Sequence, residues 1–535
     1  MTNQIDLPAS RIRVLVMDNL AQKGVDLLQQ TPGFEVEVQG KLAPEALKER
    51  CQGKHALIVR SATRVTADLL SSAPTLKVVG RAGVGVDNVD LEAATTRGVV
   101  VMNTPGGNTI SAAEHTVSML LSLAKHIPQA TASMKGGKWE KGKFLSVELS
   151  GKILGIIGLG RIGSEVAKRA RAFNLRVIVY DPFVSAEAAG ALGVELVDLP
   201  ELYRLADFIT IHTPLTTETT NLIRAETIAR MKDGVRIVNC ARGGIVNEAD
   251  LCEALKSGKV AGAGLDVFAQ EPTTDSPLFS LGNFIATPHL GAASEEAQEA
   301  VAVEIAQQVI DYLQKGIIRN AVNAPSVPPE VLRKLQPYLV LGEKLGRVVS
   351  QLSEGRFAEI RLAYRGEIAS MDTTPLTVAT VKGVLDPSHD NVNMVSAMAI
   401  AKARGVRVIE SKSTEPTDFA SLISVGLHTD RGKTEVEGTL YSQDPRLVAI
   451  DGLRLESVLD GLLLVYSNMD VPGVIGRIGT LLGRNNVNIA GMQLGRQQRG
   501  GRAVSIVNVD DPIPAPVLEE IRRMPNIVYA KLVRV

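Results

Sequence analysis

GIIGLGRIG, residues 155–163, contains a glycine-rich turn with the spacing G-x-G-x-x-G. Gly158, Gly160 and Gly163 follow the apolar run ILGII, and the residues after them repeat apolar positions at helical spacing. Such glycines let backbone N–H groups approach a pyrophosphate at the N-terminus of a helix. Asp181 ends the next apolar run, LRVIVYD, where a carboxylate can accept hydrogen bonds from ribose hydroxyls. Strand, turn, helix and acid together predict a Rossmann domain that binds a dinucleotide.

The same acid predicts which dinucleotide binds. The carboxylate of Asp181 would repel the additional phosphate of NADP, and the residues that follow it, Pro182 and Phe183, include no arginine to attract that phosphate. We therefore expect NAD as the cofactor.

The turn begins at residue 155 of 535, although in a dinucleotide-binding domain it lies near the start of the domain. The earlier apolar runs, each followed by helical spacing, predict a separate parallel α/β lobe; they read RIRVLVMD, HALIVR, LKVVGRAG and VVVMNTP. A helix expected over 294–315, with Ser294 as its cap, would return the chain to this lobe. The sequence thus predicts a discontinuous, flavodoxin-like substrate domain, 1–105 and 300–325, with a Rossmann domain inserted at 106–299.

The C-terminal half differs in pattern. The proline-rich stretch APSVPPE marks a boundary, after which we expect an α+β domain over 326–458 that begins with a helix at 329–352. Residues 459–535 follow the order β-α-β-β-α-β, which predicts a ferredoxin-like domain.

The composition excludes several classes of protein. Lys plus Arg and Asp plus Glu number 58 each, which argues against a general attraction to nucleic acid or an anionic membrane. Apolar runs fall short of the roughly 18 residues that span a bilayer, and we expect a cytoplasmic protein. The three cysteines, Cys51, Cys240 and Cys252, lack metal-ligand spacing, so we expect them to be reduced and expect no metal.

Three polar side chains follow predicted strands downstream of the turn, at the edge where open α/β sheets bind ligands. They are Arg242 in NCARGG, Glu271 in VFAQEP and His289 in TPHLGAAS. Each alone could be a turn cap, a solvated acid or an ordinary loop histidine. Together they suit the oxidation of a 2-hydroxy acid, because arginine grips a carboxylate, histidine accepts a proton and a carboxylate stabilises protonated histidine.

The motifs GLGRIG, NCARGG, GLDVF and TPHLGAAS together resemble the D-isomer-specific 2-hydroxyacid dehydrogenases. The stretches VRSAT, GRAGVGVDNVDL, VMNTPGGNTISAAEHT and IPQATASMKGGKWEKGKF are similar to the branch of this family that acts on 3-phosphoglycerate, and the C-terminal extension is similar to its long form. This resemblance implies oxidation of 3-phospho-D-glycerate to 3-phosphohydroxypyruvate, the first step toward L-serine. It also implies that Arg242 binds the substrate carboxylate, that His289 is the acid/base and that Glu271 pairs with His289.

The resemblance extends to the ligand contacts. For the cofactor it implies Gly158, Gly160, Arg161, Ile162, Gly163, Asp181, His212, Thr213, Pro214, Cys240, Ala241, Asp266 and Gly291. For the substrate phosphate and its surroundings it implies Arg60, Ser61, Arg81, Asn103 and Lys141, the last from a neighbouring subunit, with Lys135, Lys138 and Lys143 as competing choices. We therefore expect a homodimer or homotetramer.

The tail resembles an ACT domain, a module that binds amino acids. An effector such as L-serine would place its carboxylate at the helix after Gly473, its ammonium at Asp470 and its hydroxyl at Asn468 or Asn488. The alternative is a module that serves dimerisation alone.

Two other functions stay open at this point. One is a reductase for glyoxylate or hydroxypyruvate, or for 2-oxoglutarate as a side activity; Arg60 and Arg81 argue instead for a phosphorylated substrate. The other is a corepressor that senses NAD, against which an extension built like an amino-acid sensor argues.

Overall fold

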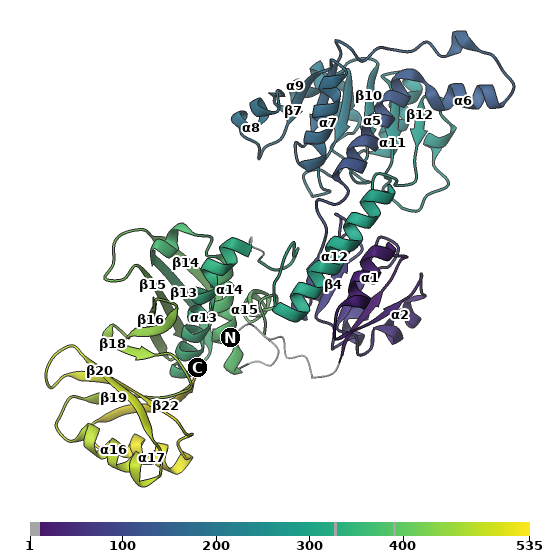
Figure 1. The fold of residues 1–535 in the computed structure, drawn as a ribbon. Helices are drawn as coiled ribbons and strands as arrows, with labels where there is room; N and C mark the ends of the chain where they lie inside the picture. The colour runs from purple at the N-terminus through teal and green to yellow at the C-terminus, as the bar shows by residue number, and fades with distance from the viewer. Residues whose placement is uncertain (1–10, 326–328, 389–391) are drawn as a thin grey trace.

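The computed structural model describes residues 11–325, 329–388 and 392–535 of the chain. Figure 1 shows an N-terminal lobe in purple and a blue-to-teal lobe, joined by the long helix α12 (Glu295–Lys315), with two further domains in green and yellow. Within the described ranges, every helix lacks the combination of length and apolar character that a membrane span requires.

The N-terminal lobe contains a five-stranded sheet in the order β2-β1-β3-β4-β5, with parallel pairing throughout. This is the flavodoxin-like strand order that the sequence predicts. The strands are β1 (Ile12–Val16), β2 (Phe34–Val38), β3 (Ala56–Val59), β4 (Val78–Arg81) and β5 (Val100–Met102), and the helices are α1 (Gln22–Gln30), α2 (Pro44–Cys51), α3 (Ala67–Ser72) and α4 (Leu91–Thr96).

Helix α12 returns the chain to this lobe. The hydroxyl of Ser294 accepts a hydrogen bond from the Ala297 amide at its start, which confirms the expected cap. Apolar side chains of α12 share a core with β1 and α1, and a Cβ added at Gly24 would lie 2.6 Å from the Ala302 carbonyl oxygen. Only glycine at this position of α1 allows the two helices to approach so closely.

The second lobe holds a seven-stranded parallel sheet in the order β12-β11-β10-β9-β6-β7-β8. The order reverses at β6, as in a Rossmann fold, which confirms the predicted fold class. The strands are β6 (Ile153–Ile157), β7 (Arg176–Tyr180), β8 (Glu195–Leu196), β9 (Phe208–Ile211), β10 (Val235–Asn239), β11 (Val260–Leu265) and β12 (Phe284–Ala286).

Helices cover the Rossmann sheet and one projects from it. The covering helices include α5 (Thr109–Lys125), α7 (Arg161–Ala172), α9 (Leu199–Leu205) and α11 (Glu248–Ser257), with the shorter α8 (Ala186–Ala191) and α10 (Ala225–Ala229). Figure 1 shows α6 (Ile127–Lys135) standing away from the sheet, and all its residues are at least partly exposed.

The third domain is a six-stranded mixed sheet, β14-β13-β15-β16-β17-β18, packed against α13 (Pro329–Leu352) and α14 (Thr374–Leu385). Helix α13 matches the helix predicted there. The other elements are α15 (Ala397–Ala403), β13 (Phe357–Gly366), β14 (Arg407–Ser413), β15 (Ser421–Thr429), β16 (Gly432–Tyr441), β17 (Asp444–Ile450) and β18 (Leu453–Val458).

The tail forms a four-stranded antiparallel sheet in the order β20-β21-β19-β22 with two helices. Its elements are β19 (Leu462–Met469), α16 (Val474–Arg484), β20 (Ile489–Arg496), β21 (Arg502–Val509), α17 (Ala515–Arg523) and β22 (Ile527–Arg534), which confirms the predicted order. The four sheets lie within the predicted domain ranges, and the residues at which one domain passes to the next stay predictions.

Candidate active site between two lobes

The glycine-rich turn lies between β6 and α7, and each of its glycines has a distinct reason to be glycine. Gly158 has φ 96°, and a Cβ there would lie 2.7 Å from the His212 carbonyl oxygen. A Cβ at Gly163 would lie 2.1 Å from the Gly158 carbonyl oxygen. At Gly160, the N-cap of α7, no atom of the described residues would lie within 4 Å of an added Cβ, so this side of the turn is open to a ligand. Arg161 and Ile162 form the first turn of α7.

Asp181, at the end of β7, supports the turn directly. One carboxylate oxygen accepts a hydrogen bond from the Leu159 amide at 2.8 Å, and the other accepts one from the Phe183 amide at 2.9 Å. The fold therefore brings the glycines and the acid together as the sequence predicts. It also gives Asp181 a second role, in holding the backbone of the turn.

The loop after β9 packs on the same turn. Burial lowers the pKa of His212 to about 4, so its ring is neutral near pH 7, and its Nε2 lies 3.1 Å from the Thr210 hydroxyl. The hydroxyl of Thr213, which precedes Pro214, is buried without a hydrogen-bond partner among the described residues. An orphaned hydroxyl beside an open glycine turn fits a polar ligand such as a dinucleotide.

His289 and Glu271 contact each other at the carboxyl edge of the sheet. His289 Nδ1 lies 2.7 Å from Glu271 Oε2, and Glu271 Oε1 accepts a hydrogen bond from the Phe268 amide at 2.9 Å. Burial raises the pKa of Glu271, but the hydrogen bonds from His289 and from the Phe268 amide outweigh it and lower the pKa overall. Because Nδ1 is engaged, Nε2 of His289 is the nitrogen that can exchange a proton with a substrate.

Arg242 follows β10 and reaches across to the N-terminal lobe. Its Nε donates a hydrogen bond to Asp87 Oδ2 at 3.1 Å, and its Nη1 donates to the Ala241 carbonyl at 2.7 Å. A Cβ at Gly85 would lie 2.0 Å from Arg242 Nη2, so the glycine leaves room for the guanidinium. A Cβ at Gly243 would lie 1.8 Å from the Phe268 carbonyl oxygen, which brings the Arg242 loop against the loop of Glu271.

The N-terminal lobe supplies positive charge at the ends of its strands. Arg81 lies at the end of β4, its Nε is buried without a partner among the described residues, and a Cβ at Gly83 would lie 1.6 Å from its Nη1. Burial, together with the charges of Arg242 and Arg60, lowers the pKa of Arg81 to about 10. The guanidinium stays positive near neutral pH. An anion between these arginines would satisfy both the charge and the orphaned Nε.

The other expected substrate residues lie at neighbouring strand ends. The Arg60 amide donates to Asp18 at 2.9 Å, which anchors the end of β3, and Ser61 follows it. Asn103, just after β5, donates from its side chain to the Val84 carbonyl at 2.6 Å. Lys141 lies in a short 3₁₀ turn (Lys141–Lys143) that follows helix α6 in the chain, and no hydrogen bond or ion pair between described residues joins it to this cluster.

Two of the expected cofactor residues, Asp266 and Ala241, make hydrogen bonds within the chain, and a third, Cys240, is a protonated thiol. The Asp266 carboxylate accepts hydrogen bonds from the amides of Leu290 and Gly291, at 2.7 and 2.9 Å. Cys240 follows β10, and burial raises the pKa of its thiol to about 12. The Ala241 amide donates to the Asn239 side chain at 3.0 Å. Sequence reasoning had no signal for the second role of Asp266, nor for Asp87.

The expected effector residues in the tail already have partners in this chain. Asp470 pairs with Arg496 and accepts a hydrogen bond from the Gly500 amide, and the Asn488 side chain donates to Asp510 at 2.6 Å. Asn468 donates to the Met469 carbonyl, and its Oδ1 is buried without a partner among the described residues. Gly473, with φ 90°, is the N-cap of α16.

The chain matches three family models along its length. Residues 117–291 match the NAD-binding domain of the D-isomer-specific 2-hydroxyacid dehydrogenases, residues 334–451 match the D-3-phosphoglycerate dehydrogenase intervening domain, and residues 462–526 match the ACT domain. The NAD-binding match confirms the expected cofactor.

Solved structures are similar to part of the chain. The Aquifex aeolicus D-lactate dehydrogenase complexed with NAD and lactic acid has 29% sequence identity and a TM-score of 0.51, and the alignment covers 58% of this chain and 100% of that one. The TT0316 protein of Thermus thermophilus has 38% identity and a TM-score of 0.54, and the alignment covers 58% of this chain and 99% of that one.

Two curated relatives align with nearly the whole chain. The D-3-phosphoglycerate dehydrogenase of Methanocaldococcus jannaschii is 44% identical, over 96% of this chain and 98% of its own. That of Bacillus subtilis is 43% identical, over 97% of this chain and 99% of its own. With this identity over this length, and with all three domain models in order, the chain belongs to the D-3-phosphoglycerate dehydrogenases, within the D-isomer-specific 2-hydroxyacid dehydrogenases.

Proposed function

We propose that this enzyme oxidises 3-phospho-D-glycerate to 3-phosphohydroxypyruvate with NAD, the first step of the phosphorylated route to L-serine. One observation carries the proposal: a paired histidine and glutamate lie at the edge of a Rossmann sheet, with arginines from both lobes close by. His289 Nδ1 is 2.7 Å from Glu271 Oε2, and the positive charge of Arg242 lowers the pKa of Arg81. The relatives named for this activity align over nearly the full chain.

The substrate loses a proton from its 2-hydroxyl and a hydride from C2. NAD, when bound, supplies the hydride acceptor. Nε2 of His289 takes the hydroxyl proton, and the Glu271 carboxylate stabilises the imidazolium that results. In the reverse reaction the same nitrogen returns the proton to the carbonyl oxygen.

Arg242 grips the substrate carboxylate, and this requires an exchange of partners. In the ligand-free chain its Nε donates to Asp87 at 3.1 Å. That pair is weak because the Asp87 side chain is mostly exposed. The substrate carboxylate offers two oxygens to the guanidinium in place of one, so it displaces Asp87.

The phosphate of the substrate binds to the arginines of the N-terminal lobe. Arg81 offers a buried Nε that has no partner among the described residues, and the charge of Arg60 lowers the pKa of Arg81. Ser61 and Asn103 lie at the same edge, and Lys141 of a second subunit adds a further cation. The homodimer or homotetramer that this requires, and a cytoplasmic location, stay predictions.

When NAD binds, Gly158, Gly160 and Gly163 with the first turn of α7 would hold its pyrophosphate, and Asp181 would accept hydrogen bonds from its ribose. The residues after β9, β10 and β11, together with Gly291, would hold the rest of the cofactor.

L-Serine is the effector that we propose for the tail. The helix start after Gly473 receives its carboxylate, and Asp470 receives its ammonium after releasing Arg496. Asn468, with a buried Oδ1 that has no partner among the described residues, binds the hydroxyl.

The test of the catalytic proposal is formation of NADH from 3-phosphoglycerate, compared with D-glycerate, D-lactate and 2-hydroxyglutarate. We expect kcat/KM to favour the phosphorylated substrate by about 10²-fold or more, since a site built for an anion rejects analogues that lack it. Arg81→Met removes a phosphate ligand and should narrow this preference, whereas the exposed Arg454→Met, on the third domain, should leave it unchanged. Equal turnover of D-glycerate and 3-phosphoglycerate would contradict the assignment. NAD binding without turnover of any of these acids would favour a sensor.

A further inference from the structure

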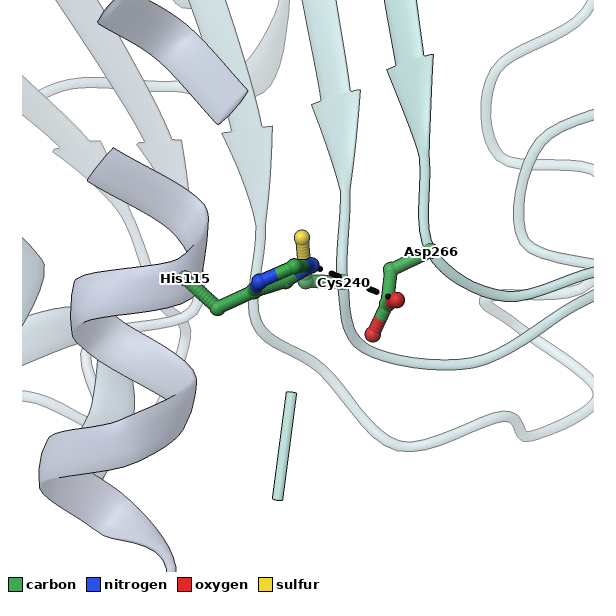
Figure 2. A group of neighbouring side chains, drawn as sticks. All are labelled: His115, Cys240 and Asp266. Atoms are coloured by element: carbon green, nitrogen blue, oxygen red, sulfur yellow. Dashed lines mark ion pairs between the residues drawn. The ribbon is translucent and has the colours of Figure 1, made fainter. Parts of the chain in front are cut away.

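Three side chains from distant parts of the chain meet behind the loop of His289. His115 lies on α5, Asp266 follows β11 and Thr287 follows β12. Figure 2 shows His115 pointing from its helix toward Asp266 across the ends of the strands, with Cys240 close to the ring. The Asp266 side chain is fully buried, and the His115 side chain is 19% exposed.

The hydrogen bonds between these side chains have a definite direction. The Thr287 hydroxyl donates to Asp266 Oδ1 at 2.6 Å. A hydroxyl has one proton, so the contact of 3.0 Å between Thr287 Oγ1 and His115 Nε2 requires the histidine to donate. His115 therefore carries a proton on Nε2, which also lies 3.3 Å from Asp266 Oδ1.

Asp266 in turn holds three consecutive residues of the catalytic loop. Its carboxylate accepts the amides of Leu290 and Gly291, and its backbone carbonyl accepts the His289 amide at 2.9 Å. His289 has φ 56°, a conformation that non-glycine residues adopt only with support from their surroundings. The position of the His289 ring thus depends on Asp266.

A buried carboxylate needs compensation for the water that it loses. Burial raises the pKa of Asp266, but the hydrogen bonds from His115 and Thr287 and the amides of Leu290 and Gly291 lower the pKa overall. Two other groups lie near His115. The Cys240 thiol stays protonated, and Glu114 on the same helix pairs with Arg169 of α7. Asp266 is therefore the acidic group with which His115 interacts.

We propose that His115 is a positioning residue for the reaction: through Thr287 it keeps the Asp266 carboxylate in place, and Asp266 fixes the loop that carries His289. His115 contacts neither substrate nor cofactor in this role. The inference rests on the proposed function, because it takes His289 as the proton acceptor.

The test compares His115→Leu with His115→Gln, whose amide can still donate toward Thr287. Two quantities are measured against pH: kcat for 3-phosphoglycerate, and the dissociation constant of NADH from its fluorescence. His115→Leu should lower kcat about tenfold, since a hydrogen bond to a charged network is lost. Asp266, freed from its depressed pKa, would also protonate at a higher pH, so the acid limbs of both profiles should move to higher pH.

His115→Gln should recover most of kcat. Ser118→Ala is the matched control, because Ser118 lies on the same helix and its hydroxyl donates to the Glu114 carbonyl instead of to the cluster; its profiles should equal those of the parent. If both pH profiles of His115→Leu equal those of the parent, the inference is overturned. This holds even if the unfolding temperature falls, because a residue that affects only stability has a purely structural role. A parent that forms no NADH from 3-phosphoglycerate would instead refute the proposed function, and the NADH profiles would still decide the role of His115.

Discussion

The catalytic edge and the tail prepare their ligand sites in opposite ways. At the catalytic edge His289 and Glu271 are already paired, and Arg81 keeps a buried Nε without a partner among the described residues. In the tail, Asp470 is bound to Arg496. The proton-transfer pair of the first site is thus preformed, although Arg242 must still leave Asp87. In the tail, the side chain proposed to bind the effector's ammonium is itself held in an ion pair.

The difference has a structural cause. The catalytic groups follow buried parallel strands, and their loops are fixed by close backbone contacts, such as the one that makes Gly243 obligatory. In the tail, Asp470 follows β19 and Arg496 ends β20 of an antiparallel sheet, and the Arg496 side chain is 49% exposed, so the ion pair forms and breaks at little cost. Preorganisation favours catalysis, and an exchangeable pair suits the effector that we propose for the tail.

The largest expected effect comes from breaking the preformed pair. His289→Ala should lower kcat by about 10²- to 10⁴-fold, because no group remains to accept the hydroxyl proton. NADH affinity should change little, since His289 contacts Glu271 and not the glycine turn. Steady-state kinetics and an NADH titration measure both quantities, with His428→Gln in the third domain as control. Turnover within a few-fold of the parent would assign the proton to another group.

The next effect concerns the cofactor end of the preorganised site. Asp181→Ala should weaken NAD binding about tenfold or more, because the ribose loses its acceptor and two backbone amides lose theirs. The preference of the enzyme for NAD over NADP should narrow, because the negative charge that repels the additional phosphate of NADP is lost. Asp181→Asn separates the two causes, since it keeps an oxygen for the turn and removes the charge. If both variants discriminate as the parent does, cofactor choice is made elsewhere.

A smaller effect is expected from Glu271→Gln. The parent keeps a carboxylate here through the neutral range, because the hydrogen bonds that lower the pKa of Glu271 outweigh its burial. Without that negative charge the imidazolium of His289 is less stable, so the acid limb of kcat should move to lower pH. The measurement is kcat against pH at saturating substrate. If the acid limb of the kcat profile does not move, Glu271 is not the charged partner of His289.

The smallest effect on basal activity is expected in the tail. Asp470→Ala should leave turnover without serine unchanged and should abolish the heat of serine binding in calorimetry. In the parent, serine should change affinity at the catalytic site by about 5- to 150-fold, if the coupling is expressed in binding. If the parent releases no heat on titration with serine, the tail serves assembly alone. Heat that survives in Asp470→Ala would place the effector elsewhere.

Much of the fold was predictable from the sequence because the signals are local. Gly163 is demanded by the Gly158 carbonyl within one strand–turn–helix unit, Gly158 is favoured by its local φ of 96°, and the cap at Ser294 bonds to an amide three residues away. The alternation of apolar runs and helical spacing predicts both parallel sheets for the same reason.

Contacts between distant segments were not predictable in this way. Asp87 meets Arg242 because two lobes face each other, and His115 meets Asp266 because α5 packs beside the strand ends. Neither pair has a spacing in the sequence that differs from chance. In the tail, the pairing of Asp470 with Arg496 depends on how the ends of β19 and β20 lie together, which residue type alone does not determine.

Helix α12 has a consequence for synthesis of the protein on the ribosome. Val14 and Val16 of the first strand share a core with Val301, Ile305 and Val309 of this helix. The lobe that is made first therefore cannot close its core until the inserted Rossmann lobe has also been made, a delay on the order of ten seconds or more at typical rates of translation. During that time the apolar surface of the N-terminal lobe stays exposed and can bind chaperones. The Rossmann lobe, although it is made later, can finish folding first.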